Sequence, residues 1–106
     1  MILVRYSLEN GYYTHLIVTG HAEYAEYGND LICASVSSIM FGLMNCLDEY
    51  QDVTINVGEN KIEIKNECKL DEVNNFMKLA LIQLKTIEES YGEFIKVERK
   101  WVWNIF

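Results

Sequence analysis

Residues 20–37 read GHAEYAEYGNDLICASVS, and this stretch separates a strand pattern before it from a helix pattern that begins inside it. The apolar spacing that follows predicts a helix over 31–47. Asp30 is its predicted N-cap, because an Asp carboxylate accepts hydrogen bonds from the free N–H groups of a first helical turn. The span 21–29 carries acidic and tyrosine side chains without apolar periodicity, so we predict a loop there.

The same stretch places a cysteine and a histidine close to the predicted helix start. With Asp30 as cap, Cys33 is in the first turn, where the helix dipole and the unpaired N–H groups stabilise an anion such as a thiolate. The loop can fold His21 back onto the thiol, whose proton an imidazole can accept. Alone, the cysteine would be a small buried residue and the histidine a surface residue. Their spacing favours a Cys–His nucleophilic pair.

Four further residues of the stretch are predicted to support this pair. Gly20 and Gly28 bound the loop and would act as its hinges. Asp30 either only caps the helix or also orients the histidine as a third member of the site. Ser37 lies one helical turn after the cysteine on the same face, where it either contacts the site or admits close packing.

The rest of the chain supplies strands and a second helix around this segment. Alternating apolar residues predict strands over 2–8, 12–19, 52–57, 61–65 and 93–103, with Asn10-Gly11 as a hairpin turn between the first two. A second helix is predicted over 72–90, capped by Asp71 and ended by Gly92. The order ββ-α-ββ-α-β predicts an α+β fold: a two-layer sandwich in which two helices cover one face of a mostly antiparallel sheet.

Composition limits the class of protein. The 106 residues suit a single domain over 1–106, and a formal net charge of −7 argues against direct nucleic-acid binding. That charge suits a basic protein or peptide partner, or it serves solubility alone. The three cysteines form no C-x-x-C pair and have no ligands at zinc spacing, so we expect no metal and no other cofactor. Cys46, Cys68 and His15 are assigned structural roles.

Neither a signal peptide nor a membrane-spanning run is predicted, which favours a cytoplasmic protein with reduced thiols. Two features point to a partner. The helix over 31–47 is apolar nearly all round, so a second subunit can bury its outer side, and close packing against a neighbouring backbone would explain Gly42 in its middle. The aromatic tail 101–106 either covers the sheet or lies against a partner.

The motif resembles the signature of a known family. Gly20-His21-Ala22, Gly28, Asp30, Cys33-Ala34 and Ser37, together with Thr86-Ile87-Glu88-Glu89 in the second predicted helix, look like the ribosomal-processing cysteine protease family, Prp. The resemblance extends in element order over nearly the whole chain. It rests on several residue types at fixed spacing, which is far more specific than a lone cysteine and histidine.

The resemblance implies a concrete activity. Members of this family are cytosolic bacterial cysteine endopeptidases that remove a short N-terminal extension from large-subunit ribosomal protein twenty-seven during ribosome assembly. By this resemblance His21 would be the base and Cys33 the nucleophile. The family forms homodimers, and a mobile loop beside the site, here about 21–28, closes over the substrate.

Two other classes of function stay open from the sequence. One is a non-catalytic ribosome-assembly protein that binds a peptide with the same fold. The other is a thiol-redox protein, against which the absence of a resolving cysteine beside Cys33 counts.

Overall fold

The computed structural model describes residues 1–20 and 27–101, and side chains in the second range from residue 31. The elements follow the predicted order: β1 (Ile2–Glu9), β2 (Tyr12–Thr19), α1 (Tyr27–Leu47), β3 (Val53–Val57), β4 (Lys61–Asn66), α2 (Asp71–Tyr91) and β5 (Ile95–Arg99). The last strand is shorter than the predicted span 93–103. No helix in the described ranges is long and apolar enough to cross a bilayer.

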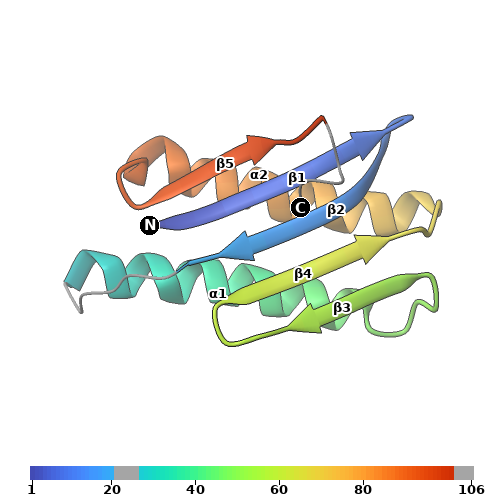
Figure 1. The fold of residues 1–106 in the computed structure, drawn as a ribbon, viewed down its shortest axis with the longest axis horizontal. Coiled ribbons are helices and arrows are strands. Elements are labelled where there is room, and N and C mark those ends of the chain that lie inside the picture. Colours follow the sequence, from blue (N-terminus) through green and yellow to red (C-terminus); the bar gives the residue numbers. More distant parts are fainter. Residues whose placement is uncertain (21–26, 102–106) are drawn as a thin grey trace.

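The strands form one sheet of five in the order β3-β4-β2-β1-β5 (Figure 1). Neighbouring strands are antiparallel except for the pair β1 and β5, which is parallel. The chain reaches β5 through α2, the crossover helix that a parallel pair requires. The predicted α+β class and mostly antiparallel sheet are confirmed.

The turn between β1 and β2 has the predicted geometry. Asn10 and Gly11 both have positive φ, 53° and 83°, as a tight hairpin turn requires. Just beyond it the pairing shifts: Ser7 lies opposite His15 but Leu8 lies opposite Tyr13. Thr14 is therefore an extra residue in β2, a β-bulge.

Both helices pack on one face of the sheet, and the core lies between the two layers (Figure 1). The sheet contributes alternate residues of each strand, and the helices contribute one side each. The largest fully buried side chains are Val4, Leu16, Met40, Leu47, Ile64, Val73, Met77, Leu81, Leu84 and Ile95.

The first helix begins earlier than the sequence predicted. It starts at Tyr27 instead of Leu31, so Asp30 is the fourth residue of α1 and not its N-cap, and Gly28 lies in the first turn and not in a loop. Apolar periodicity marks only the residues that contact the core and cannot detect a first turn beyond it. An acidic residue there is still favourable, because it lies near the positive end of the helix dipole.

The second helix also corrects two details. Its N-cap is Leu70, which has no side-chain capping hydrogen bond, and Asp71 lies in the first turn, where it complements the dipole. Gly92 ends the helix as predicted, but its φ of −61° is right-handed, so the left-handed conformation that glycine often adopts at a helix end is absent at this residue. A side chain there would instead crowd the Glu88 carbonyl oxygen, which lies 3.1 Å from the position of a Cβ.

The side of α1 that faces away from the core carries fewer large apolar side chains than predicted. Met40 and Met44 are buried in the core, whereas Phe41 is 52% exposed. A Cβ on Gly42 would meet no atom of the described residues within 4 Å, so close packing against that part of the chain does not explain this glycine. Cys46 is exposed and has no core role, whereas Cys68 is buried as predicted.

Candidate active site

A groove of about 290 Å³ lies where α1, the end of β2 and the turn between β3 and β4 meet. We call it the Cys33 groove. Cys33, Ser37 and Phe41 line it from α1, and Gly20 lines it from the end of β2. The three helix residues are four positions apart, so they share one face of the helix. The groove therefore combines a thiol, a hydroxyl and an exposed aromatic ring in one row.

Cys33 is half-buried, so its thiol is within reach of solvent. Counted from Tyr27 it is the seventh residue of α1 and not the third. The effect of the helix dipole falls off beyond the first turn, so the helix end stabilises a thiolate at Cys33 less than the sequence argument implied. A neighbouring base is correspondingly more important for activating the thiol.

Gly20 ends β2 at the rim of the Cys33 groove. Its φ of +84° is a left-handed conformation, and a Cβ would overlap the Met1 carbonyl oxygen. Its N–H donates to the Asn60 carbonyl oxygen at 3.2 Å, which links β2 to the turn on the other side of the groove. The position thus requires glycine, and the residue after it in the chain is His21.

We expect Gly20→Ala to lower both stability and activity. A left-handed alanine costs about 1–2 kcal/mol, and the Cβ must also push the backbone of Met1 away. The melting temperature should fall by roughly 10 °C, and peptide cleavage should fall by at least about tenfold because the residues after Gly20 are displaced. Gly58→Ala is the control, since its Cβ would lie 3.7 Å from its nearest neighbour. Equal melting temperatures for the two variants would contradict this account.

The other predicted site residues are distributed as follows. Ser37 is exposed and lines the groove beside Cys33. His21 lies outside the described residues, and so does most of the predicted loop. Asp30 and Gly28 belong to the first turn of α1, three and five residues before Cys33. The structure therefore joins three of the predicted residues, Gly20, Cys33 and Ser37, around one groove.

Sequence reasoning missed two contributors to the groove. These are Phe41 of α1 and the turn 58–60, neither of which is among the predicted site residues. The spacing of Phe41 from Cys33, two steps of four residues, was a signal that could have found it. The turn had no such signal, because its position depends on the pairing of β4 with β2.

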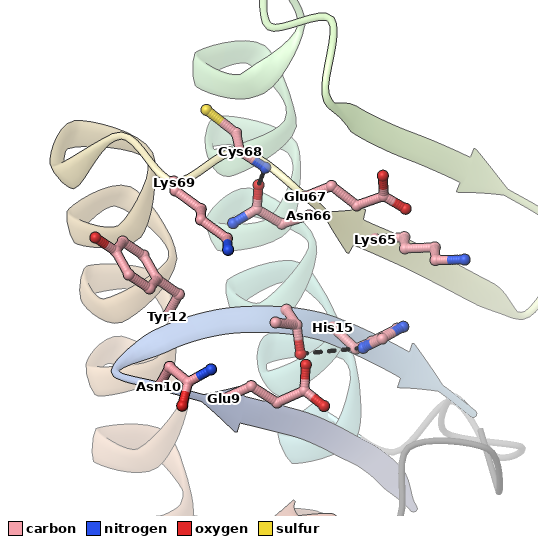
Figure 2. Close-up of a pocket in the computed structure, with 10 residues that line it drawn as sticks. Glu9, Asn10, Tyr12, His15, Lys65, Asn66, Glu67, Cys68 and Lys69 are labelled. Atoms are coloured by element: carbon pink, nitrogen blue, oxygen red, sulfur yellow. Dashed lines mark hydrogen bonds between the residues drawn. The ribbon is translucent and has the colours of Figure 1, made fainter.

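A larger cavity, about 450 Å³, lies at the opposite ends of β2 and β4 and contains neither Cys33 nor Gly20 (Figure 2). His15 lines it, as do Lys65 and Lys69. The His15 Nδ1 lies 2.9 Å from the Ser7 hydroxyl oxygen and 3.2 Å from that of Thr14, the bulged residue. Its place at the other end of β2 separates His15 from the thiol site.

The environment of His15 disfavours its protonated form. Burial lowers its pKa below the ordinary 6.5, and the Lys65 ammonium lowers it further, while the carboxylates of Glu9, Glu63 and Glu67 act in the opposite direction. The unfolded chain therefore binds the proton more readily than the folded chain. Stability linked to His15 is fully present above pH 6.5 and is lost as the pH falls toward its lower folded value.

We expect His15→Gln to weaken the pH dependence of stability. Urea denaturation from about pH 7.5 to about pH 5 should show a larger loss of unfolding free energy in the wild type than in the variant, because the variant cannot take up this proton. An NMR titration of the His15 ring should give a midpoint below 6.5. A midpoint above 6.5 would reverse the sign and contradict the prediction.

Solved structures match this arrangement closely. The crystal structure of the essential ribosomal processing protease Prp from S. aureus with a substrate peptide is similar over 94% of this chain and 100% of that chain, with a TM-score of 0.85 and 31% identity. The structure of the same S. aureus protease with a covalently linked product peptide has a TM-score of 0.83 and 32% identity over 94% of this chain and 100% of that chain.

An α+β sandwich with a half-buried thiol in an open groove, similar to these peptide complexes, defines a cysteine protease. The model of the family "Cysteine protease Prp" matches residues 1–96. The ribosomal processing cysteine protease Prp of Staphylococcus aureus is 32% identical over 97 residues, 87% of this chain and 92% of that protein. Its Bacillus subtilis counterpart is 50% identical over 89 residues, 76% of this chain and 80% of that protein. The chain belongs to the Prp family of ribosomal processing cysteine proteases.

Proposed function

We propose that this protein is the endopeptidase that removes the N-terminal extension of large-subunit ribosomal protein twenty-seven during bacterial ribosome assembly, with Cys33 as nucleophile and His21 as base. One observation carries the proposal. Cys33 lines an open groove whose rim is formed by Gly20, the residue directly before His21. A peptide in this groove meets the thiol, and the chain that enters the loop starts beside it.

The chemistry follows from these two side chains. The His21 imidazole accepts the Cys33 thiol proton, and the sulfur adds to the scissile carbonyl carbon. When the tetrahedral intermediate collapses, the C–N bond breaks and His21 returns its proton to the departing amine. Water then attacks the thioester, His21 takes a proton from that water, and hydrolysis releases the extension as a carboxylic acid while the thiol regains its proton.

Because α1 starts at Tyr27, the N–H groups around Cys33 are not the free donors that the oxyanion needs. A cysteine in the first turn would have had unpaired N–H groups around it, but the unpaired groups of this helix belong to residues 27–30. Cys33 lies beyond them, so the groups of its own turn are engaged within the helix. Other donors near Cys33 are therefore needed, and the groove offers the Ser37 hydroxyl and the backbone of the turn 58–60.

The homodimer belongs to the same proposal. The exposed side of the helical layer carries Leu79 at 56% and Ile82 at 50% exposure, both on α2. A second groove, about 300 Å³, runs between α1 and α2 past Gly42 and Leu79. These exposed apolar groups on the face opposite the sheet support a second copy as their partner. Ribosome assembly is a cytoplasmic process, so we place the protein there.

The test is incubation of the purified protein with the extended ribosomal protein from the same organism. We expect one cleavage, at the junction between extension and mature protein, seen as two new masses. Binding should weaken as salt rises, because the net charge of −7 attracts a basic partner through screened interactions. Precursor that stays intact over many hours, or cleavage at many sites, would contradict the proposed function.

A further inference from the structure

The sheet has two edge strands, β3 and β5, and they differ in whether their outward backbone groups are hydrogen-bonded. An edge strand presents unpaired N–H and C=O groups that can pair with another extended chain. Proteins usually block such edges with charges, proline or a covering side chain. Which edge stays open therefore indicates where an extended peptide can bind.

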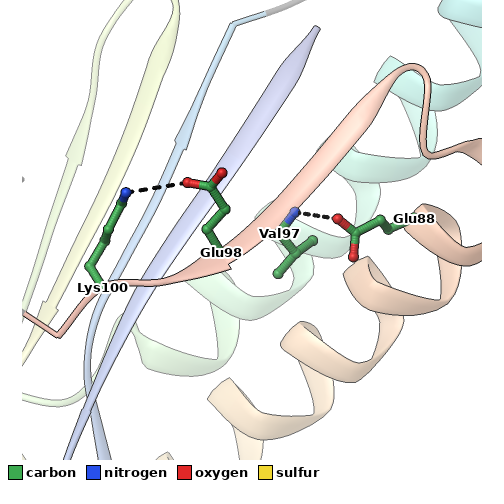
Figure 3. A network of polar contacts seen from close by, with 4 residues as sticks. All are labelled: Glu88, Val97, Glu98 and Lys100. Atoms are coloured by element: carbon green, nitrogen blue, oxygen red, sulfur yellow. Dashed lines mark hydrogen bonds and ion pairs between the residues drawn. The ribbon is translucent and has the colours of Figure 1, made fainter.

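The β5 edge is closed. The Val97 N–H points away from β1, and it donates to the Glu88 carboxylate of α2 at 2.7 Å (Figure 3). Next to it Lys100 and Glu98 form an ion pair at 3.3 Å. The middle N–H of this edge is thus occupied by a side chain of the same protein, and charged residues flank it. A peptide could pair here only by displacing Glu88.

The β3 edge has no covering strand or side chain among residues 1–20 and 27–101. The Gly58 N–H donates to the Lys61 carbonyl oxygen at 2.7 Å, and the Glu67 N–H donates to the Asp52 carbonyl oxygen at 2.9 Å. In an antiparallel pair the hydrogen-bonded residues alternate, so these two bonds show that the N–H and C=O groups of the even-numbered residues of β3 are bonded to β4. The N–H and C=O groups of Ile55 and Val57 are directed outward. The strand reads VTINV and contains neither a charged residue nor proline.

The open edge leads into the Cys33 groove. Val57, the last residue of β3, lines that groove together with Cys33. Its side chain is 58% exposed, and Phe41, across the groove on α1, is 52% exposed. A strand added to β3 would place alternate side chains toward these two apolar groups, and its continuation past Val57 would pass the thiol.

We propose that the protease binds its substrate by β-strand addition, in which an extended peptide segment pairs with the outward N–H and C=O groups of Ile55 and Val57 and continues past Cys33. This rests on the proposed function and adds the substrate conformation to it. Backbone pairing supplies affinity that is independent of side chains, and the exposed apolar groups select side chains at alternate positions.

Amide hydrogen exchange measured by NMR tests the pairing directly. The probe is a synthetic peptide that spans the cleavage junction of the ribosomal protein, added in excess to the Cys33→Ala variant so that it stays intact. The amides of Ile55 and Val57 should exchange at least about tenfold more slowly in the complex, as newly bonded amides do. The Val97 amide, already bonded to Glu88, is the internal control and should not change.

A pair of variants tests the same contact by kinetics. Val57→Pro removes the outward N–H without removing a bond to β4, whereas Val57→Ala keeps that N–H and removes most of the side chain. We expect the KM of the proline variant to exceed that of the alanine variant by about three- to tenfold with similar kcat, which corresponds to the loss of one backbone hydrogen bond. Equal KM values in two folded variants would overturn the proposal.

The results of these experiments distinguish failure of strand addition from failure of the proposed protease function. Cleavage of the peptide by the wild type, with unchanged exchange at Ile55 and Val57 on binding, overturns strand addition and leaves the proposed function intact. A peptide that is neither bound nor cleaved overturns both. Slow exchange at these two amides without peptide, increasing with protein concentration, would show that a second copy occupies the edge and would also overturn the proposal.

Discussion

Cys33→Ala should abolish cleavage of the ribosomal protein precursor, lowering kcat/KM by about 10⁴-fold or more, because in the proposed mechanism the Cys33 sulfur forms the bond to the acyl group. No other thiol can replace it. Cys68 is buried, and Cys46 lies more than three turns further along α1 in a different groove. The loss should appear in kcat and not in KM, because the substitution removes only a small side chain and leaves the rest of the peptide-binding groove intact. Rates of product formation by mass spectrometry measure it.

The matched control is Cys46→Ala, which changes an exposed cysteine on the same helix outside the Cys33 groove. It should cleave at the wild-type rate. Binding of the junction peptide to Cys33→Ala, measured by calorimetry, should stay within a few-fold of the affinity of the wild type with its thiol blocked by a small reagent. Residual cleavage at more than about a tenth of the wild-type rate would assign the nucleophile elsewhere.

His21→Ala should lower kcat by about 10²–10⁴-fold, the range in which a positioned acid–base group contributes. Cys33 is the seventh residue of α1 and lies beyond the first turn, where the effect of the helix dipole is largest, so the proposed mechanism assigns activation of the thiol to His21. Added imidazole should restore part of the rate, which a purely structural loss would not allow. Product formation with and without imidazole, at fixed peptide concentration, is the measurement.

His15→Ala is the control for this experiment, because it removes the other histidine of the chain, which lines the cavity at the far end of β2. It should keep most of the cleavage rate in protein that is still folded, and imidazole should have no effect on it. If His15→Ala is inactive while His21→Ala cleaves normally, the base has been assigned to the wrong residue.

Much of the candidate site was predictable because it depends on local spacing. The four-residue step from Cys33 to Ser37 places both on one helix face wherever the helix begins, and both line the groove. The prediction of Asp30 as N-cap was wrong for the same reason, because the four-residue spacing does not show that α1 starts at Tyr27. Gly20 was predicted as a loop hinge, but the requirement for glycine comes from Met1, far from it in the chain.

Local patterns were sufficient to predict the elements of this fold. The alternation in β3 and β4 and the apolar stripes of the two helices indicate the burial of one face, and the Asn10-Gly11 pair indicates a tight turn; each agrees with the structure. The order of the strands, the parallel pairing of β5 with β1 and the position of the β3 edge beside Cys33 came only from contacts between distant segments. A periodic pattern shows which side of a segment avoids water, whereas the neighbour of a strand depends on hydrogen bonds between residues far apart in the chain, such as that from Gly20 to Asn60.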